Sequence, residues 1–506
     1  MALTVNTNIA SITTQGNLNK AGGALATSMQ RLSSGLRINS AKDDAAGLQI
    51  ANRLTSQING LGQAVKNVND GISIAQTAEG AMQASTDILQ KMRTLALSSA
   101  TGSLSADDRK SNNDEYQALT AELTRISATT TFGGQKLLDG SYGTKAIQVG
   151  ANANETINLS LENVAANKIG SQQIKTSGVK IDDTGLVKGD INVTGNGQSK
   201  DISYAAGASA KDIAAQLNGA IGGLSASAST EVKFTVDEVT TKGTPAILDG
   251  TGAVTTPAVA GKPANFKLSV GNGTAVSFVG VTDTASLADQ LKSNSAKLGI
   301  TVNYDEVNNT LEVKSDSGEN LKFTSGTDSA AISVNSKDGQ GKYQVDNTGK
   351  EAPQALTTGD YVVTGQISLD SAKGYSLGQS TATGAADGVS QLFGNPTASS
   401  VKTNISDTDV TNASNAQNAL AVIDKAIGTI DSVRSGLGAT QNRLTTTADN
   451  LQNIQKNSTA ARSTVQDVDF ASETAELTKQ QTLQSASTAI LSQANQLPSA
   501  VLKLLQ

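Results

Sequence analysis

The sequence predicts a chain that is mainly α-helical at both ends, as an antiparallel, coiled-coil-like bundle with a β-hairpin, and that carries α+β and β-rich lobes in the middle. Three observations predict this fold class. No proline precedes Pro245 and only Pro498 follows Pro396, so both ends are free to form helices. Apolar residues at both ends recur in steps of three and four, as in amphipathic helices. The middle shows alternation and an internal repeat instead.

The strongest periodic signal lies in the N-terminal part and predicts one helix over residues 42–99. Steps of four and three are typical of a coiled-coil seam. A second helix follows, because Ser105 and Asp108 have the spacing of a capping box. The predicted seam consists of Leu54, Ile58, Leu61, Val65, Val68 and Ile72. The second helix carries Tyr116, Leu119, Leu123 and Ile126.

The segment "QRLSSGLRINSAKDDAAGLQIA", residues 30–51, predicts a joint between two helices. Gly35 can end a helix at low steric cost. Ser40 with Asp43 can cap the long helix near Ala41, and Asp44 adds a carboxylate that favours the positive helix end. Residues 1–34 thus form a separate arm with a sparse stripe, composed of Ile9, Ile12, Leu18, Leu25, Met29 and Leu32.

The C-terminal part mirrors the N-terminal part. Helical spacing is carried by Leu420, Ile423, Ile427, Ile430, Leu437, Leu444, Ala448 and Leu451. Pro498 is expected to kink the last helix or to begin a new turn. The terminal assembly stripe on that helix consists of Leu483, Ile490, Ala494, Leu497, Val501 and Leu504.

These patterns predict an elongated hairpin in which the N- and C-terminal helices lie antiparallel and the middle projects from the far tip. We expect an inner terminal-arm domain from residues 1–41 and 457–506. A helical core domain follows from residues 42–175 and 401–456, and a variable, surface-exposed region from residues 176–400. Residues 133–165 alternate around Gly and Asn turns, which predicts a small β-hairpin packed on the helices.

The middle contains two copies of one pattern, each a strand, a short helix and a second strand. Ile202, Tyr204, Ile213, Leu217 and Leu224 recur 74 positions later as Val276, Phe278, Leu287, Leu291 and Leu298. Two copies are too few for a solenoid, so we expect two related α+β lobes. Residues 326–400 are weakly patterned, and no regular structure is predicted there.

Composition disfavours several function classes. The net charge of -6 without a basic stripe argues against nucleic-acid binding. The chain has no Cys and no His, which removes thiolate metal sites and the usual general base, although carboxylate-only or Ser/Lys catalysis stays open. No apolar stretch is long enough to span a membrane, and the first residues do not resemble a cleavable signal peptide. We therefore predict a protein that is not an enzyme and needs no cofactor or metal.

The aromatic share of 3% leaves few large core-filling side chains. Helices this poor in large apolar residues are marginal alone. We therefore expect the chain to complete its burial against other molecules.

Residues 1–165 and 405–506 are similar to bacterial flagellin, the subunit of the flagellar filament. The similarity is carried by "RLSSGLRINSAKDDAAGLQIANR", "NDGISIAQTAEGA", "TTFGGQKLLDG", "IQVGANANETI", "IDSVRSGLGATQNRL" and "SQANQLPSAVLKLL". The 74-residue copies resemble an insert motif of flagellins and hook-associated proteins.

This resemblance implies a homopolymer that forms the extracellular filament for swimming motility. Paired terminal arms would form an inner tube, and the long helices with the hairpin an outer tube. The arms would be disordered in the free subunit and fold on assembly. Export would use the flagellar type III apparatus without a cleaved signal. The implied partners are an export chaperone on the C-terminal arm and the filament cap and hook-junction proteins.

The resemblance also implies recognition by host flagellin receptors. Residues 30–51, with Asp43 and Asp44, match the region that plant receptors bind. The patch bound by the animal flagellin-sensing Toll-like receptor matches Lys91, Leu95 and Glu115. Arg is frequent in the family at the position of Lys91, and lysine lacks its planar fork of donors.

Two alternatives stay open at this level. A hook–filament junction protein also has helical ends, but the unbroken match through "KLLDG" favours flagellin. Some flagellins carry a metalloprotease in the variable region, which requires the motif H-E-x-x-H and hence histidine.

Overall fold

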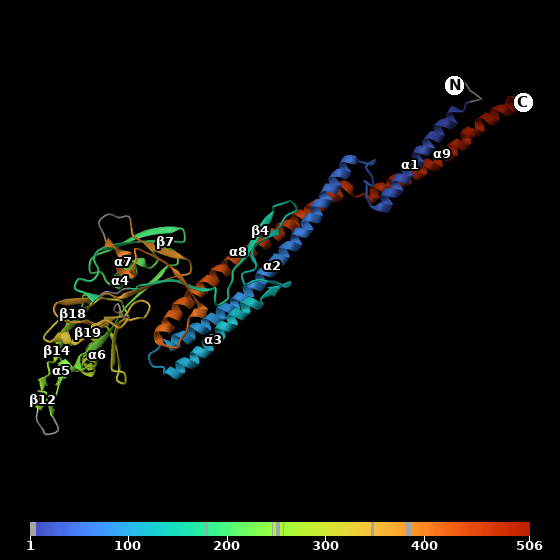
Figure 1. Ribbon diagram of the computed structural model, residues 1–506. Helices are drawn as coiled ribbons and strands as arrows, with labels where there is room; N and C mark the ends of the chain where they lie inside the picture. Colours follow the sequence, from blue (N-terminus) through green and yellow to red (C-terminus); the bar gives the residue numbers. More distant parts are fainter. Residues whose placement is uncertain are drawn as a thin grey trace. The chain divides into compact units, whose positions relative to one another are not determined.

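The computed structural model describes residues 7–177, 181–244, 246–248, 254–256, 258–345, 349–380 and 386–505. The chain divides into two compact units, drawn in Figure 1. The first unit comprises residues 1–77, 143–160 and 436–506. The second comprises residues 78–142 and 161–435. The chain crosses between the two units within its two longest helices, α2 (Ala45–Ser99) and α8 (Ala413–Gln466).

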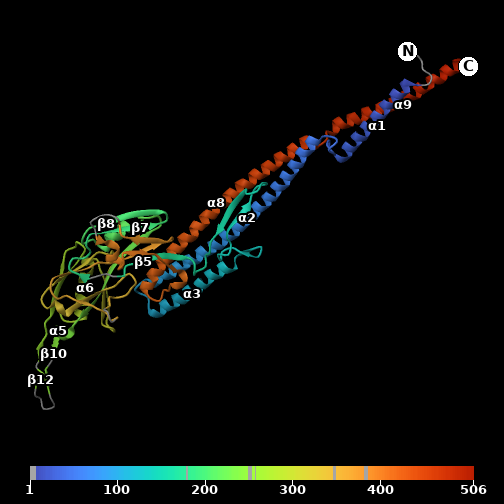
Figure 2. The ribbon, with the colours of Figure 1, turned by 45° about the horizontal axis from the view of Figure 1, so that its top comes forward.

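The two terminal helices of the first unit pair antiparallel, as the sequence predicts. Helix α1 spans Ile9–Ser34 and α9 spans Phe470–Leu505. The side-chain amide of Asn8 donates to the carbonyl of Ala494 at 2.8 Å, so the start of α1 meets the end of α9. Figures 1 and 2 show the two helices side by side. Helix α9 continues through Pro498, so the new turn considered there is absent.

A β-hairpin packs on the helices of the first unit, which confirms that prediction. Strands β3 (Gly143–Gln148) and β4 (Thr156–Leu161) pair, and Ile147 and Val149 contact the apolar cluster between α2 and α8. Gly71 of α2 makes room for this contact. A Cβ there would lie 2.5 Å from Cδ1 of Ile147, closer than packed atoms approach.

The helical part of the second unit contains α3 (Ala106–Thr129), which begins with the predicted capping box of Ser105 and Asp108. Tyr116 on α3 is fully buried. Its hydroxyl lies 2.6 Å from Oγ1 of Thr408, just after the short 3₁₀ helix η2 (Ile405–Asp407). Because Oγ1 of Thr408 donates to the carbonyl of Ile405, the tyrosine hydroxyl is the donor in this pair.

The two sequence copies adopt matching elements. The first copy forms β7 (Gly189–Gly195), β8 (Gln198–Tyr204), α4 (Ala210–Leu217) and β9 (Ser225–Val236). The second forms β14 (Ala264–Val270), β15 (Val276–Val281), α6 (Thr284–Leu298) and β16 (Thr301–Asp305). Both short helices begin with a capping box, at Ser209 and at Asp283.

The strands of the second unit form three larger sheets. One has the order β15-β14-β18-β21-β6, and a second has the order β24-β7-β23-β25 with β8 on β7. The third has the order β16-β17-β9-β22-β5-β26, with β19 on β9 and β20 on β19. The strands not yet bounded are β5 (Gly170–Lys175), β6 (Ile181–Asp182), β17 (Thr310–Ser315), β18 (Leu321–Ser325), β19 (Ile332–Ser336), β20 (Gln354–Ala355), β21 (Asp360–Val363), β22 (Gln366–Ser371), β23 (Tyr375–Gly378), β24 (Ala386–Asp387), β25 (Thr397–Ser399) and β26 (Val401–Asn404).

The third sheet unites the two copies. Strand β9 of the first copy pairs with β17, which pairs with β16 of the second. Val232 and Phe234 of β9 belong to the core that also contains Phe266 and Phe278 of the second copy. Ala226 of β9 packs on the core of the first copy. The two copies therefore share one sheet rather than forming independent lobes.

Residues 326–400, to which the sequence pattern assigned no structure, contain regular strands. Strand β22 pairs with both β9 and β5, inside the third sheet. Its buried residues Ile367 and Leu369 alternate with Gln366, Ser368 and Asp370. That period of two was present in the sequence but was outweighed by the polar residues around it.

The remaining elements are small. They are β1 (Thr131–Phe132), β2 (Gln135–Lys136), α5 (Glu238–Lys242), β10 (Gly243–Thr244), β11 (Ile247–Leu248), β12 (Val254–Thr256), β13 (Val259–Ala260), the 3₁₀ helix η1 (Ser329–Ala331) and α7 (Gly388–Phe393). None of the described helices combines the length and the apolarity needed to cross a bilayer.

We expect the substitution Tyr116→Phe to lower the free energy of unfolding by about 1 kcal/mol, because it removes one buried hydrogen bond. It should also reduce the loss of stability at alkaline pH. Burial raises the pKa of Tyr116 to about 12, above its usual value. Stability from the neutral hydroxyl is complete below the pKa of the unfolded chain and is lost as pH rises through the folded-state pKa.

Urea-unfolding midpoints of both proteins at pH 8 and pH 11, followed by circular dichroism, check this expectation. The other tyrosines are common to both proteins and serve as the internal control. If the urea midpoint falls equally in the wild type and in Tyr116→Phe between pH 8 and pH 11, Tyr116 does not cause the loss of stability at alkaline pH.

Candidate assembly surface

Gly35 ends α1 and begins a short joint between helices. It adopts φ +72°, a left-handed conformation that glycine reaches without strain. The joint is tied to the break between α8 and α9. Leu36 forms an antiparallel bridge with Asp467, and the amide of Arg37 donates to the carbonyl of Gln466 at 2.7 Å. The breaks in the two helical segments therefore lie side by side.

The start of α2 differs from the sequence expectation. The helix begins at Ala45, and Oδ1 of Asp44 accepts from the amide of Gly47 at 2.8 Å, so Asp44 is the cap. Asp43 instead folds back on Ser40 and accepts from its hydroxyl at 2.9 Å. The predicted cap of Ser40 with Asp43 near Ala41 is wrong, because this pair closes the turn that precedes the helix.

Several hydrogen bonds within this turn converge on the carboxylate of Asp43. Its Oδ2 also accepts from the amides of Ser40 and Asn39. These hydrogen bonds, with the Ser40 hydroxyl as the largest cause, lower the pKa of Asp43. All four predicted joint residues thus lie within one connected stretch. The C-terminal domain boundary expected at residue 456 lies inside α8, and the helix break follows Gln466.

The fully buried positions of α1 in its contact with α9 are small and mostly polar, and the half-buried Leu18, Leu25 and Leu32 lie between them on the same face. The buried residues of α1 are Ser11, Thr14, Ala21 and Ser28, in steps of three, seven and seven. At the ends of the pair, the Ser11 hydroxyl donates to Asn495 at 2.8 Å, and Arg31 lies 3.7 Å from Glu473. Such a layer lets two helices approach closely but buries little apolar surface.

Several large apolar residues of both terminal helices face away from this contact, whereas Leu18, Leu25 and Leu32 of α1 are half-buried. On α1, Ile9 is 68% exposed, and Ile12 and Met29 are more than half exposed. On α9, Leu483 is 45% and Ile490 55% exposed. The two helices therefore leave part of their hydrophobic surface uncovered, which is typical of an interaction surface.

The described members of the predicted terminal stripe on α9 differ in burial. Leu483 and Ile490 are exposed, whereas Ala494 is buried against α1. The side chains of Leu497, Val501 and Leu504 lie outside the described part of the structure. The buried Ser, Thr and Ala positions of α1 were not predicted, because only large apolar residues were assigned to the stripe. Their steps of three and seven were the available signal.

The predicted seam residues lie on α2 at different depths. Leu61 and Val68 are buried with Leu444, Ala448 and Leu451 of α8. Val65 and Ile72 are half-buried at the edge of the same cluster, and Leu54 and Ile58 are half-buried nearer the joint. Ala64 is buried in the cluster as well and was not predicted.

The three residues of the predicted immune-receptor patch lie on the helices of the second unit. Lys91 on α2 and Glu115 on α3 are exposed. Leu95 on α2 is half-buried, whereas its neighbours Met92 and Ala96 are buried. The side chain of Leu95 is thus partly available to another molecule.

Comparison with known proteins gives three family matches. The family described as the bacterial flagellin N-terminal helical region matches residues 5–143, and the bacterial flagellin C-terminal helical region matches residues 420–505. The flagellin hook IN motif matches residues 190–240 and 265–317, which contain the two copies.

Individual relatives match over the whole chain. The sequence is 50% identical to the B-type flagellin of Pseudomonas aeruginosa, with all of both chains covered. It is 37% identical to flagellin A of Vibrio anguillarum, again with all of both chains covered. The solved structure of FliC from Burkholderia pseudomallei is 21% identical, with a TM-score of 0.29, and covers 74% of this chain and 99% of that one.

We expect Gly35→Ala to destabilise the paired terminal helices by about 1 kcal/mol, because alanine is strained at φ +72°. Gly35→Asn is the matched control, since asparagine tolerates this conformation better than other residues with a side chain. No atom lies within 4 Å of a Cβ at this position, so the backbone alone is tested.

The measurement is the temperature at which self-associated protein dissociates, followed by light scattering. We expect the dissociation temperature to be highest for the wild type, lower for Gly35→Asn and lowest for Gly35→Ala. An unchanged temperature for Gly35→Ala would contradict the role of Gly35 in the joint.

Proposed function

The chain belongs to the bacterial flagellin family, and we propose that the outward faces of α1 and α9 are the surface through which its copies polymerise. The protein is a structural subunit of the extracellular flagellar filament, which drives swimming. The observation that supports the assigned surface is the placement of Ile9, Ile12, Leu483 and Ile490 away from the α1–α9 contact.

Burial of these residues by neighbouring subunits would supply the stability that the helix pair lacks alone. Burying one large aliphatic side chain contributes about 1.5–3 kcal/mol. The inner layer of Ser11, Thr14 and Ser28 offers little of this kind. In our proposal the terminal arms are disordered in the free subunit and fold when several copies meet, so folding and assembly are coupled.

The joint separates this terminal-arm domain from the helical core domain. We place the division at residues 35–44 on one side and 467–469 on the other, where both helices are interrupted. Residues 176–400 then form the variable, surface-exposed region. This division keeps the arms free to rearrange while the helical core stays folded.

Further partners follow from the same surface. We propose that an export chaperone covers the apolar side of α9, around Leu483 and Ile490, before assembly. The filament cap and hook-junction proteins would contact the subunits at the two ends of the polymer. Export would use the flagellar type III apparatus. The role is structural, and we assign no catalysis to a chain without His or Cys.

Host receptors are proposed as a second class of partner. The exposure of Lys91 and Glu115 and the partial exposure of Leu95 support contact with the animal receptor. Residues 30–51, with the joint residues Asp43 and Asp44, are the proposed plant-receptor region. A hook–filament junction role is disfavoured, because the full-length relatives at 50% and 37% identity are flagellins.

We expect the double variant Leu483→Ser with Ile490→Ser to raise the critical concentration for polymerisation about a hundredfold, because two apolar contacts between subunits are lost. The matched control is Val279→Ser with Val307→Ser, since these residues of the second unit are also exposed, at 66% and 92%. Sedimentation of seeded protein and negative-stain electron microscopy give the measurement. Normal filaments from the Leu483 and Ile490 variant would contradict the assigned surface.

We expect Lys91→Arg to lower the concentration needed for half-maximal activation of the animal receptor by about threefold or more. The planar guanidinium donates two parallel hydrogen bonds where the ammonium acts as a point charge. A reporter-cell assay measures the effect. Lys110→Arg on α3 is the control, because Lys110 is also exposed and lies outside the patch. Equal responses from all three proteins would argue against Lys91 as a receptor contact.

A further inference from the structure

The third sheet of the second unit has one apolar face and one polar face. On β9, Val232 and Phe234 point into a core, while the alternate residues Ser227, Ser229 and Glu231 line a cavity on the other side. On the neighbouring strand β22, Ile367 and Leu369 are buried, and Gln366 and Ser368 line the same cavity. The polar face is thus built by several strands in register.

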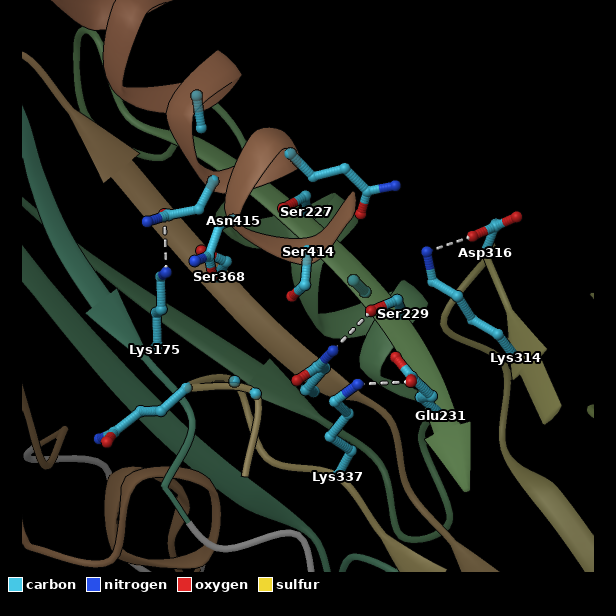
Figure 3. A pocket seen from close by; sticks show the side chains of 18 of the residues that line it. Lys175, Ser227, Ser229, Glu231, Lys314, Asp316, Lys337, Ser368, Ser414 and Asn415 are labelled. Carbon is cyan, nitrogen blue, oxygen red and sulfur yellow. Dashed lines mark hydrogen bonds and ion pairs between the residues drawn. The ribbon is translucent and has the colours of Figure 1, made fainter. Parts of the chain in front are cut away.

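A cavity of about 350 Å³ lies over this face, shown in Figure 3. Its opposite wall is the first turns of α8, which contribute Ser414, Asn415 and Asn418. A second cavity of about 420 Å³ shares Ser229, Gln366 and other residues with the first. The volume of each is within the range of small-molecule sites.

Two of the three lysines at the first cavity are neutralised by nearby carboxylates. Lys337 lies 2.6 Å from Glu231, and Lys314 lies 2.7 Å from Asp316. The two pairs are drawn in Figure 3. Neither lysine therefore carries a free charge toward a ligand.

Lys175 is different. Its Nζ donates to the neutral Oδ1 of Asn418 at 2.7 Å, and within the described residues it forms no ion pair. Burial lowers the pKa of Lys175, and the charge of Asp370 opposes that shift. An ammonium group in this setting gains from an added carboxylate, because the desolvation cost of its charge is already incurred.

An uncompensated acceptor lies close to Lys175. The Oε1 atom of Gln366 is buried and has no hydrogen-bond partner, while its Nε2 donates to Ser229 at 2.9 Å. Ser368 pairs directly with Lys175 across the strands, and Gln366 is two residues along β22 on the same face. Diagonal neighbours of this kind are about 7–8 Å apart. A single small ligand can therefore reach both groups.

We propose that this cavity binds a hydroxylated carboxylate of monosaccharide size, of the uronic acid class. The carboxylate would pair with Nζ of Lys175, and a ring hydroxyl would donate to Oε1 of Gln366. Further hydroxyls would exchange hydrogen bonds with Ser229, Ser368 and Asn415. The two serine hydroxyls both donate and accept, as sugar hydroxyls require, whereas Asn415 offers its Oδ1 as an acceptor because its Nδ2 already donates to Asp409.

Other ligand classes fit the cavity less well. An apolar molecule would leave the buried polar groups of the lining without partners, at a cost of about 1–3 kcal/mol for each. A neutral sugar would offer Lys175 no ion pair, so its charge would be offset only by Asp370, which also lines the cavity and forms no ion pair with it among the described residues. A simple carboxylate such as acetate would not reach Gln366. The cavity contains no residue of α1 or α9, so this proposal is independent of the assembly surface.

The test is a ligand-observed NMR titration of the full-length monomeric protein with glucuronate. Glucose is the neutral ring without the carboxylate, and acetate is the carboxylate without the ring. We expect glucuronate to bind at least about tenfold more tightly than either. The substitution Lys175→Gln should weaken glucuronate binding by about tenfold or more, whereas Lys175→Arg should retain part of the affinity.

The matched control is Lys200→Gln, because Lys200 is an exposed lysine of β8 outside the cavity. The affinity of this variant for glucuronate should equal that of the wild type. Circular dichroism of each variant verifies that it is folded. A second variant, Gln366→Leu, should weaken glucuronate binding while leaving acetate unaffected. Equal affinity for glucose and glucuronate, unchanged affinity in Lys175→Gln, or no binding of glucuronate would each overturn the proposal.

Discussion

The structure of both ends depends on the antiparallel pairing of segments from opposite ends of the sequence. Helix α2 buries Leu61 and Val68 only because Leu444 and Leu451 of α8 cover them. Helix α1 runs along α9, since Asn8 meets Ala494 at one end and Arg31 meets Glu473 at the other. A chain with 3% aromatic residues cannot fold such helices separately, because each alone buries too little apolar surface.

The two helix pairs use this arrangement in different ways. The α2–α8 contact of the first unit is apolar and is completed by the β3–β4 hairpin, with Gly71 allowing Ile147 to approach. The fully buried positions of α1 in the α1–α9 contact are Ser, Thr and Ala, and Ile9, Ile12, Leu483 and Ile490 remain exposed. In our proposal, the second pair therefore gains stability from neighbouring copies. The joint, where Leu36 bridges Asp467, lies between the α1–α9 pair and the α2–α8 pair.

In the middle of the chain, one strand of a sheet contributes to two hydrophobic cores. Strand β9 is shared between the two sequence copies, so one long strand contributes to both cores. Its other face is polar and, together with β22 and β5, lines a cavity closed by α8. Charges on this face are compensated pairwise at Glu231 and Asp316, which leaves Lys175 as the distinctive group. In our proposal, this cavity binds a small ligand that pairs with Lys175.

The sequence by itself determined the helical ends, the capping box at Ser105, the hairpin and the two copies in the middle, because all of these follow from local periodicity and local hydrogen bonds. The tertiary structure decided which face of each helix is covered. Leu483, Ile490 and Ala494 follow one spacing in the sequence, yet only Ala494 faces α1. It also decided that Asp44 rather than Ser40 caps α2, and that β22 is an inner strand despite its polar neighbours. Periodicity shows that a face exists, but the partner that covers it is distant in the sequence, so only the folded chain can select between a covered face and an exposed one.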